Sequence, residues 1–140
     1  MTKMLVPVDG SEQSCEAAKW AAKWAAEVGG SITLLHVHVV PGPEVMAMAH
    51  LSREKIEEIE TRHAGPSFQK ARDTVGDTAI EDTLIAIGDA GEEITGIARS
   101  KGFDHIVMGS RGLSDIKGLL MGSVSHKVSN LADCSCITVK

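Results

Sequence analysis

Short apolar runs alternate along the chain with longer stretches whose polar residues recur at helical spacing. Unbroken apolar runs of this length are typical of strands that are covered on both faces of a sheet. They predict strands at residues 5–8, 32–40, 82–88, 104–109 and 136–139. Strands that alternate with helices favour right-handed β-α-β crossovers. We therefore expect an α/β fold with a doubly wound, mostly parallel sheet.

The stretches between the apolar runs carry helix signals. Helices are predicted from Ser11 to the Gly29-Gly30 pair, over residues 44–75 and 89–101, and after Gly122. Ser11 is a suitable N-cap, and glycine commonly ends a helix. Because proline lacks the amide hydrogen that a helix interior needs, we expect the helix over residues 44–75 to be broken or kinked near Pro66.

Size and charge narrow the class of protein. A chain of 140 residues with 43% hydrophobic content can bury one core and is too short for two ordinary domains, which predicts a single domain over residues 1–140. The net charge of −5 argues against a nucleic-acid partner, because proteins that bind nucleic acids usually carry a basic face.

Cysteine usage and hydropathy point to the cytoplasm. The three cysteines, Cys15, Cys134 and Cys136, form neither a set of disulfide pairs nor two metal-binding C-x-x-C motifs, which suits a reducing compartment. The longest apolar run, residues 32–40, is far below membrane-spanning length. We therefore expect a cytoplasmic protein without membrane insertion.

A glycine-rich stretch, GSRGLSDIKGLLMGS, follows the fourth predicted strand and runs into the last predicted helix. It matches neither the P-loop nor the G-x-G-x-x-G fingerprint. The amides at a helix N-terminus and the helix dipole nevertheless favour phosphate without a lysine, and glycine permits close approach to a ligand. Ser123 could add a hydroxyl donor, with Arg111 and Lys117 as counter-charges. The alternative is that a long strand-to-helix loop simply needs turn residues.

These residues resemble the universal stress protein family, and specifically its ATP-binding branch (UspA-like domain). The family pattern G-2x-G-9x-G-(S/T) is filled by Gly109, Gly112, Gly122 and Ser123. The segments VPVDGS, LLHV and IVMGSRG are equally similar to the family, so the resemblance covers essentially the whole chain.

The resemblance implies a fold, an assembly and a set of site residues. It implies a five-stranded parallel sheet of order 3-2-1-4-5 with helices on both faces, similar to the adenine nucleotide alpha hydrolases, and a homodimer. The implied adenine and ribose walls are Pro7, Val8, Asp9 and Val37, with Met108 lining the pocket. The implied phosphate contacts are Gly109, Gly112, Gly122, Ser123 and Val124.

Asp9 has a second candidate role besides contact with a ribose hydroxyl. At the carboxyl end of a buried strand, its carboxylate could hold a divalent metal, Mg²⁺ or Mn²⁺, beside the phosphates. The alternative is a residue that caps the turn before Ser11. His36 and His38 share one face of a strand and could chelate a metal, but without a third ligand at a recognisable spacing a packing role is favoured.

Three functions remain open at this stage. The favoured one is an ATP-binding regulatory protein of the stress response whose protein partner is unknown. The second is slow metal-dependent ATP hydrolysis or phosphate transfer, including self-modification at Ser110 or Ser114. The third is a nucleotide-free dimeric scaffold. Binding is favoured over turnover because only Asp9, Arg111 and Lys117 offer parts of a phosphoryl-transfer site.

Overall fold

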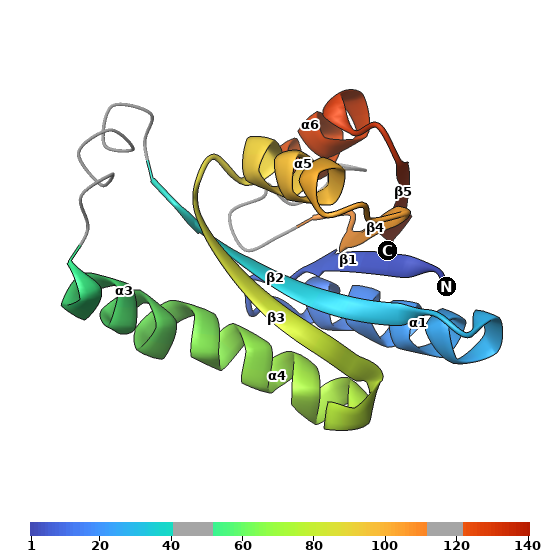
Figure 1. Cartoon of the computed structure of the whole chain (residues 1–140), viewed down its shortest axis with the longest axis horizontal. Coiled ribbons are helices and arrows are strands. Elements are labelled where there is room, and N and C mark those ends of the chain that lie inside the picture. Colours follow the sequence, from blue (N-terminus) through green and yellow to red (C-terminus); the bar gives the residue numbers. More distant parts are fainter. Residues whose placement is uncertain (41–51, 112–121) are drawn as a thin grey trace.

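The computed structural model describes residues 1–40, 52–111 and 122–140 (Figure 1). Its strands are β1 Lys3–Pro7, β2 Ser31–Val39, β3 Ile80–Gly88, β4 His105–Gly109 and β5 Ser135–Val139. Its helices are α1 Glu12–Val28, α3 Arg53–Ile59, η2 Glu60–Ala64, α4 Gly65–Val75, the short η3 Asp77–Ala79, α5 Ala90–Ser100 and α6 Ser123–Leu131. Each strand lies within two residues of the bounds that its apolar run predicts. Gly112, Ser114, Lys117 and Gly118 lie outside the described residues.

The five strands form one parallel sheet of order β3-β2-β1-β4-β5, which confirms the predicted topology. Met4 of β1 pairs with Ile32 on one side and with His105 on the other, so β1 is central. The chain proceeds from β1 outward through β2 to β3, then crosses back to β4 and β5. The winding direction therefore reverses between β1 and β4.

Helices cover both faces of the sheet, as predicted (Figure 1). On one face, α1 and the segment from α3 to α4 bury Val6 and Leu34 with Phe68. On the other face, α5 and α6 bury Leu5 with Ile94. The adjacent residues Leu5 and Val6 are both fully buried, in different clusters. Burial on both faces explains why the strands read as unbroken apolar runs.

Small side chains let α1 lie close to the sheet. Ala17, Ala18 and Ala21 are fully buried against it, and the Ser11 side chain caps the helix by accepting the Ser14 amide hydrogen. The helix ends at Gly29, which has a left-handed φ of 71°. The predicted start and stop signals of this helix are therefore confirmed.

The helix that contains Pro66 changes its hydrogen-bond pattern without breaking. Residues 60–64 form a π-helical segment, η2, between α3 and α4, and Gly65 donates its amide hydrogen to the Glu60 carbonyl five residues back. Pro66 then lies in the first turn of α4, where its missing amide hydrogen costs little. The irregularity therefore precedes Pro66, and the backbone at Gly65 stays right-handed helical.

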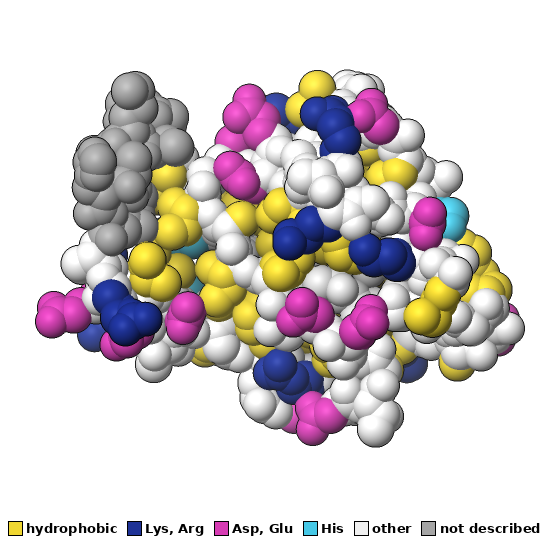
Figure 2. Space-filling view, in the orientation of Figure 1, with side chains coloured by type: hydrophobic (Ala, Val, Ile, Leu, Met, Phe, Trp, Pro, Cys, Tyr) yellow, Lys and Arg dark blue, Asp and Glu magenta, His cyan; other side chains and the backbone are white. Residues whose placement is uncertain are grey.

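Hydrophobic side chains also reach the surface on the face that carries β3, the edge strand opposite β5 (Figure 2). Ile85 of β3 is 37% exposed, and Val39 at the end of β2 is 62% exposed. In the same view, charged side chains lie among the hydrophobic ones. Within the described residues, no helix has the length and apolar character needed to cross a membrane.

Two glycines allow a matched test of whether Gly29 is needed for its left-handed backbone conformation at the end of α1. A Cβ atom at Gly29 or Gly96 would meet no neighbouring atom within 4 Å, so any difference between alanine variants comes from the backbone. Gly29→Ala should lower the free energy of unfolding by about 1 kcal/mol, because alanine is strained at a left-handed φ. Gly96→Ala, inside α5, should raise it by about 0.5–1 kcal/mol. Urea denaturation measures both, and equal effects would contradict the assignment of the Gly29 cap.

Candidate functional site

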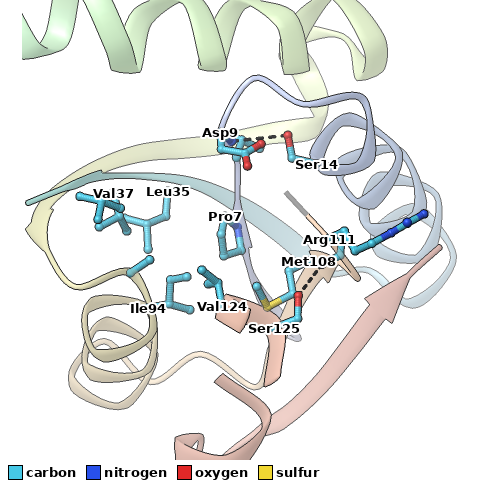
Figure 3. Close-up of a pocket in the computed structure, with 14 residues that line it drawn as sticks. Pro7, Asp9, Ser14, Leu35, Val37, Ile94, Met108, Arg111, Val124 and Ser125 are labelled. Carbon is cyan, nitrogen blue, oxygen red and sulfur yellow. Dashed lines mark hydrogen bonds between the residues drawn. The ribbon is translucent and has the colours of Figure 1, made fainter. Parts of the chain in front are cut away.

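A cavity of about 220 Å³ opens at the carboxyl ends of β1, β2 and β4, beside α5 and α6 (Figure 3). This is the crevice at the reversal of strand order, where open α/β sheets bind their ligands. Its walls are formed by Pro7, Val8, Asp9, Ser14, Leu35, Val37, Val39, Ala90, Ile94, Met108, Gly109, Arg111, Val124 and Ser125. Eight of the predicted site residues, Arg111 among them, therefore line the cavity, whereas Gly122 and Ser123 are not part of its wall.

Most of the cavity wall is apolar. Leu35 and Val37 of β2 lie near Ile94 of α5 and Val124 of α6, while Asp9 and Ser14 lie at another part of the wall (Figure 3). An apolar slot with a few polar groups suits a planar organic group that is oriented by hydrogen bonds. Ligand pockets usually measure about 300–1,000 Å³, so this cavity accommodates a base or nucleoside and leaves further groups outside it.

Asp9 both lines the cavity and shapes the turn after β1. Its Oδ1 accepts the Ser11 amide hydrogen at 2.9 Å, and its own amide donates to Ser14 Oγ at 3.4 Å. Gly10, between them, has a left-handed φ of 86°. The turn-capping role proposed as the alternative for Asp9 is thus present, and the same turn holds the carboxylate in the cavity wall.

The end of β4 is held by main-chain and side-chain hydrogen bonds. Ser110 donates its amide hydrogen to Val139 and accepts one from Gly122. Ser125 Oγ donates to the Gly109 carbonyl at 2.7 Å. A Cβ atom at Gly109 would come within 3.0 Å of the Gln13 Cβ, so the absence of a side chain there permits the close approach of α1.

Gly122 precedes α6 as its N-cap residue, with an extended φ of −75°. Its carbonyl accepts the His126 amide hydrogen at 3.0 Å, and its own amide hydrogen is donated to Ser110 within the fold. Gly122 is buried, Ser123 is exposed and Val124 is half-buried. The amide of Gly122 is therefore used within the fold, and its role as a phosphate contact stays a prediction.

Gln13 was not predicted from the sequence. Its Oε1 accepts the Arg111 amide hydrogen at 2.8 Å and so joins the first turn of α1 to the start of the glycine-rich stretch. The contact spans 98 residues of sequence. The one sequence signal for this contact is that Gln13 follows closely after Asp9 and Ser11.

A second unpredicted contact joins the middle of α6 to the start of α5. Lys127 Nζ lies 2.8 Å from Asp89 Oδ2 and 3.8 Å from Glu92 Oε1. The hydrogen bond from Lys127 and the Glu92 amide lower the pKa of Asp89, and the bond to Asp89 raises the pKa of Lys127. The Lys127 stem lies so close to Gly91 that a Cβ there would be 2.7 Å from it.

Candidate catalytic and metal-binding groups are sparse among the described residues. Ser110, one of the proposed self-modification sites, is only 3% exposed. His36 is buried, with Nδ1 3.2 Å from the Val8 carbonyl oxygen, which agrees with a packing role. Residues 1–40, 52–111 and 122–140 contain no group of three His, Cys, Asp or Glu side chains that could hold a metal.

The cysteines are free thiols. Cys15 is a buried residue of α1, and Cys134 and Cys136 are half-buried. Burial raises the pKa of both Cys134 and Cys136, which keeps them protonated and poorly nucleophilic. This environment suits a packing role for the two side chains.

The chain was compared with known proteins. It is 34% identical over 145 residues to the universal stress protein YxiE of Bacillus subtilis, covering 99% of this chain and 98% of that one. Among solved structures, MJ0577 superimposes with a TM-score of 0.79 at 27% identity, covering 99% and 95% of the two chains.

Two further solved structures share the fold at lower identity. A universal stress protein in complex with cAMP has a TM-score of 0.71 at 20% identity, covering 99% of this chain and 97% of that one. The universal stress protein of Archaeoglobus fulgidus in complex with dAMP has a TM-score of 0.69 at 22% identity, covering 100% and 98%. The model of the universal stress protein family matches residues 1–140. The chain therefore belongs to the universal stress protein family.

Proposed function

We propose that this chain is a single-domain, cytoplasmic regulatory protein of the stress response that binds ATP as a homodimer. The main support for this proposal is the cavity at the reversal of strand order, which combines an apolar slot, the Asp9 carboxylate and the start of α6. An adenine ring suits the slot between β2 and α5, and a ribose hydroxyl suits the carboxylate. Relatives solved with cAMP and dAMP support an adenine nucleotide as the class of ligand.

The phosphates would lie outside the slot, toward α6. The cavity volume of about 220 Å³ is below the range for a complete ligand site, so the polyphosphate must extend beyond it. Ser123 and Val124 belong to the first turn of α6, whose dipole favours an anion. Among the described residues of the wall, Arg111 is the one with a positive charge, and it would act as a counter-charge to the phosphates.

A divalent cation, Mg²⁺ or Mn²⁺, would accompany the phosphates. Asp9 is the carboxylate that the cavity wall offers to it, and phosphate oxygens would complete its coordination. The described residues hold no protein-only metal group, which agrees with a cation that binds together with the nucleotide. The cation would neutralise phosphate charge next to Asp9.

Regulation follows from the placement of the predicted phosphate contacts. They lie at both ends of the chain segment between β4 and α6, so bound ATP would contact both ends of this connection. These contacts would be missing in the nucleotide-free protein. Such a differential contact is what a ligand needs to shift a conformational equilibrium. The partner that responds to this change would be another protein, because the charge does not favour nucleic acid.

Substitution of Asp9 tests nucleotide binding directly. Asp9→Ala should weaken ATP binding about tenfold or more, because hydrogen bonds to a charged group contribute about 1.5–3 kcal/mol. Asp9→Asn retains an oxygen that can accept the Ser11 amide hydrogen and should lose less affinity. Calorimetric titration measures all three proteins. The absence of ATP binding by the wild-type chain would contradict the proposed function, and equal affinities would exclude Asp9 from the site.

Gln13 tests the phosphate part of the site separately. Gln13→Leu removes the acceptor of the Arg111 amide hydrogen, so ATP affinity should fall about fivefold while adenosine affinity stays unchanged. Gln13→Glu keeps the acceptor oxygen and should retain the wild-type stability in urea denaturation. An equal loss of ATP and adenosine binding in Gln13→Leu would contradict the placement of the phosphates beside Arg111.

The proposed homodimer would form at the β5 edge of the sheet. Within the described part of the chain, β5 pairs with β4 alone, and Ile137 and Val139 of β5 are only partly buried. Trp20 of α1, on the same side of the sheet, is 39% exposed and packs on Trp24 with ring centroids 5.4 Å apart. An exposed strand edge beside apolar side chains is a suitable surface for pairing with a second copy.

Trp20→Lys should convert this dimer to a monomer of 14.8 kDa in sedimentation velocity, because a charge replaces apolar contact area. Glu27→Lys, a charge change at the exposed end of α1, should leave the dimer intact. A wild-type chain that sediments as a monomer, or a Trp20→Lys variant that remains dimeric, would contradict this interface.

A further inference from the structure

Three imidazoles gather on the face of β2 opposite the cavity. His36 and His38 of β2 and His63 of η2 form this histidine cluster. The rings of His38 and His63 have centroids 4.8 Å apart at an interplanar angle of 43°. His36 meets Phe68 of α4 edge to face, with centroids 6.3 Å apart. Imidazole contacts therefore form part of the packing between β2 and the helical segment from α3 to α4.

The same stretch of β2 forms the wall of the cavity. Side chains alternate along a strand, so Val37 and Val39 line the cavity while His36 and His38 point to the other side. His36 Nδ1 also lies 3.2 Å from the Val8 carbonyl oxygen, directly before Asp9. A displacement of this stretch of β2 therefore moves the cavity wall.

The charges around the cluster are mainly positive. The groups that act on His38 are His63 of η2 and Lys55 of α3. Those that act on His36 are His38, His63 and, with opposite sign, Asp9. On β3, the register partners of His36 and His38 are the apolar residues Ile85 and Ile87.

Carboxylates on α3 do not offset this charge fully. Glu58 is paired with both Lys55, at 3.4 Å, and Arg62, at 3.8 Å, and these are exposed pairs that contribute little. A proton added to His38 therefore places a positive charge next to other basic groups in the packed layer between β2 and η2.

The direction of the pH effect follows from the histidine environments. Burial lowers the pKa of His38, and His63 and Lys55 lower it further. Burial likewise lowers the pKa of His36, against the opposing hydrogen bond to Val8. Below pH 6.5, the ordinary histidine value, the folded chain then holds fewer protons than the unfolded chain. Stability associated with the cluster is complete above that pH and is lost as the pH falls.

We propose that the histidine cluster is a proton-responsive element of the nucleotide site. Acidification charges His38, repulsion from His63 and Lys55 loosens the contact between β2 and η2, and the cavity wall on the other face of β2 binds its ligand less tightly. This regulation rests on the proposed nucleotide binding. It gives the protein a direct response to acid stress.

The test compares ATP affinity at two pH values in variants that differ only in a histidine. From about pH 7.5 to about pH 5.5, wild-type affinity should fall by several-fold and by no more than about tenfold, the limit that linkage to one proton with an ordinary histidine pKa sets. His38→Gln, which cannot take up the proton, should lose less than about threefold. His126→Gln, at an exposed histidine outside the cluster, should behave as the wild type. Since a terminal phosphate titrates near pH 6, the difference between variants is the decisive quantity.

A second measurement does not depend on the ligand. Between the same pH values, acidification should lower the urea midpoint of the wild type by about 0.5 M more than that of His38→Gln. If His38→Gln does not fold, His63→Gln, at an exposed ring, takes its place. The urea midpoint of His63→Gln should then also fall less than that of the wild type. Equal losses in the wild type and both cluster variants would overturn the proton response. Absence of ATP binding at both pH values would overturn the proposed function and its regulation, while the urea series would still show whether the cluster responds to protons.

Discussion

The parallel pairing of β1 with β2 on one side and β4 on the other determines where the candidate site and the elements around it lie. Because β1 is central and covered on both faces, its residues from Met4 to Pro7 are apolar. The first polar residue after it, Asp9, emerges at the edge where the chain reverses its direction of winding. The cavity, the turn before α1 and the end of β4 are all consequences of that reversal.

Strand positions could be predicted because they depend on short-range patterns, whereas the order of the strands in the sheet was implied by the family resemblance. Each strand is an apolar run that ends in glycine, proline or polar residues, and burial on both faces makes that run continuous. The predicted residues of the cavity wall, such as Val37 and Met108, follow from the resemblance once the strand ends are aligned. Local chemistry also predicts the Ser11 cap and the Gly29 stop.

The contacts that hold the cavity together could not be predicted in the same way. Gln13 reaches Arg111 only because α1 packs directly on the end of β4, where Gly109 has no side chain. His63 meets His38 only because the π-helical segment sets the rotation of the helix over β2. Both contacts depend on how two elements pack in three dimensions, and the periodicity of each element does not predict that packing. Pro66 marked the right helix, but the irregularity that accommodates it lies one turn earlier.

One residue, Ser110, joins the candidate site to the β5 edge of the sheet. The amide hydrogen of Ser110 goes to Val139, the last residue of β5, and its carbonyl accepts from Gly122, immediately before α6. A shift at the first turn of α6 is therefore only one residue removed from the strand that borders the molecule. The start of α6 and the end of β5 thus share one residue, Ser110, which bonds to Val139 on the amino side of its Cα atom and to Gly122 on the carboxyl side.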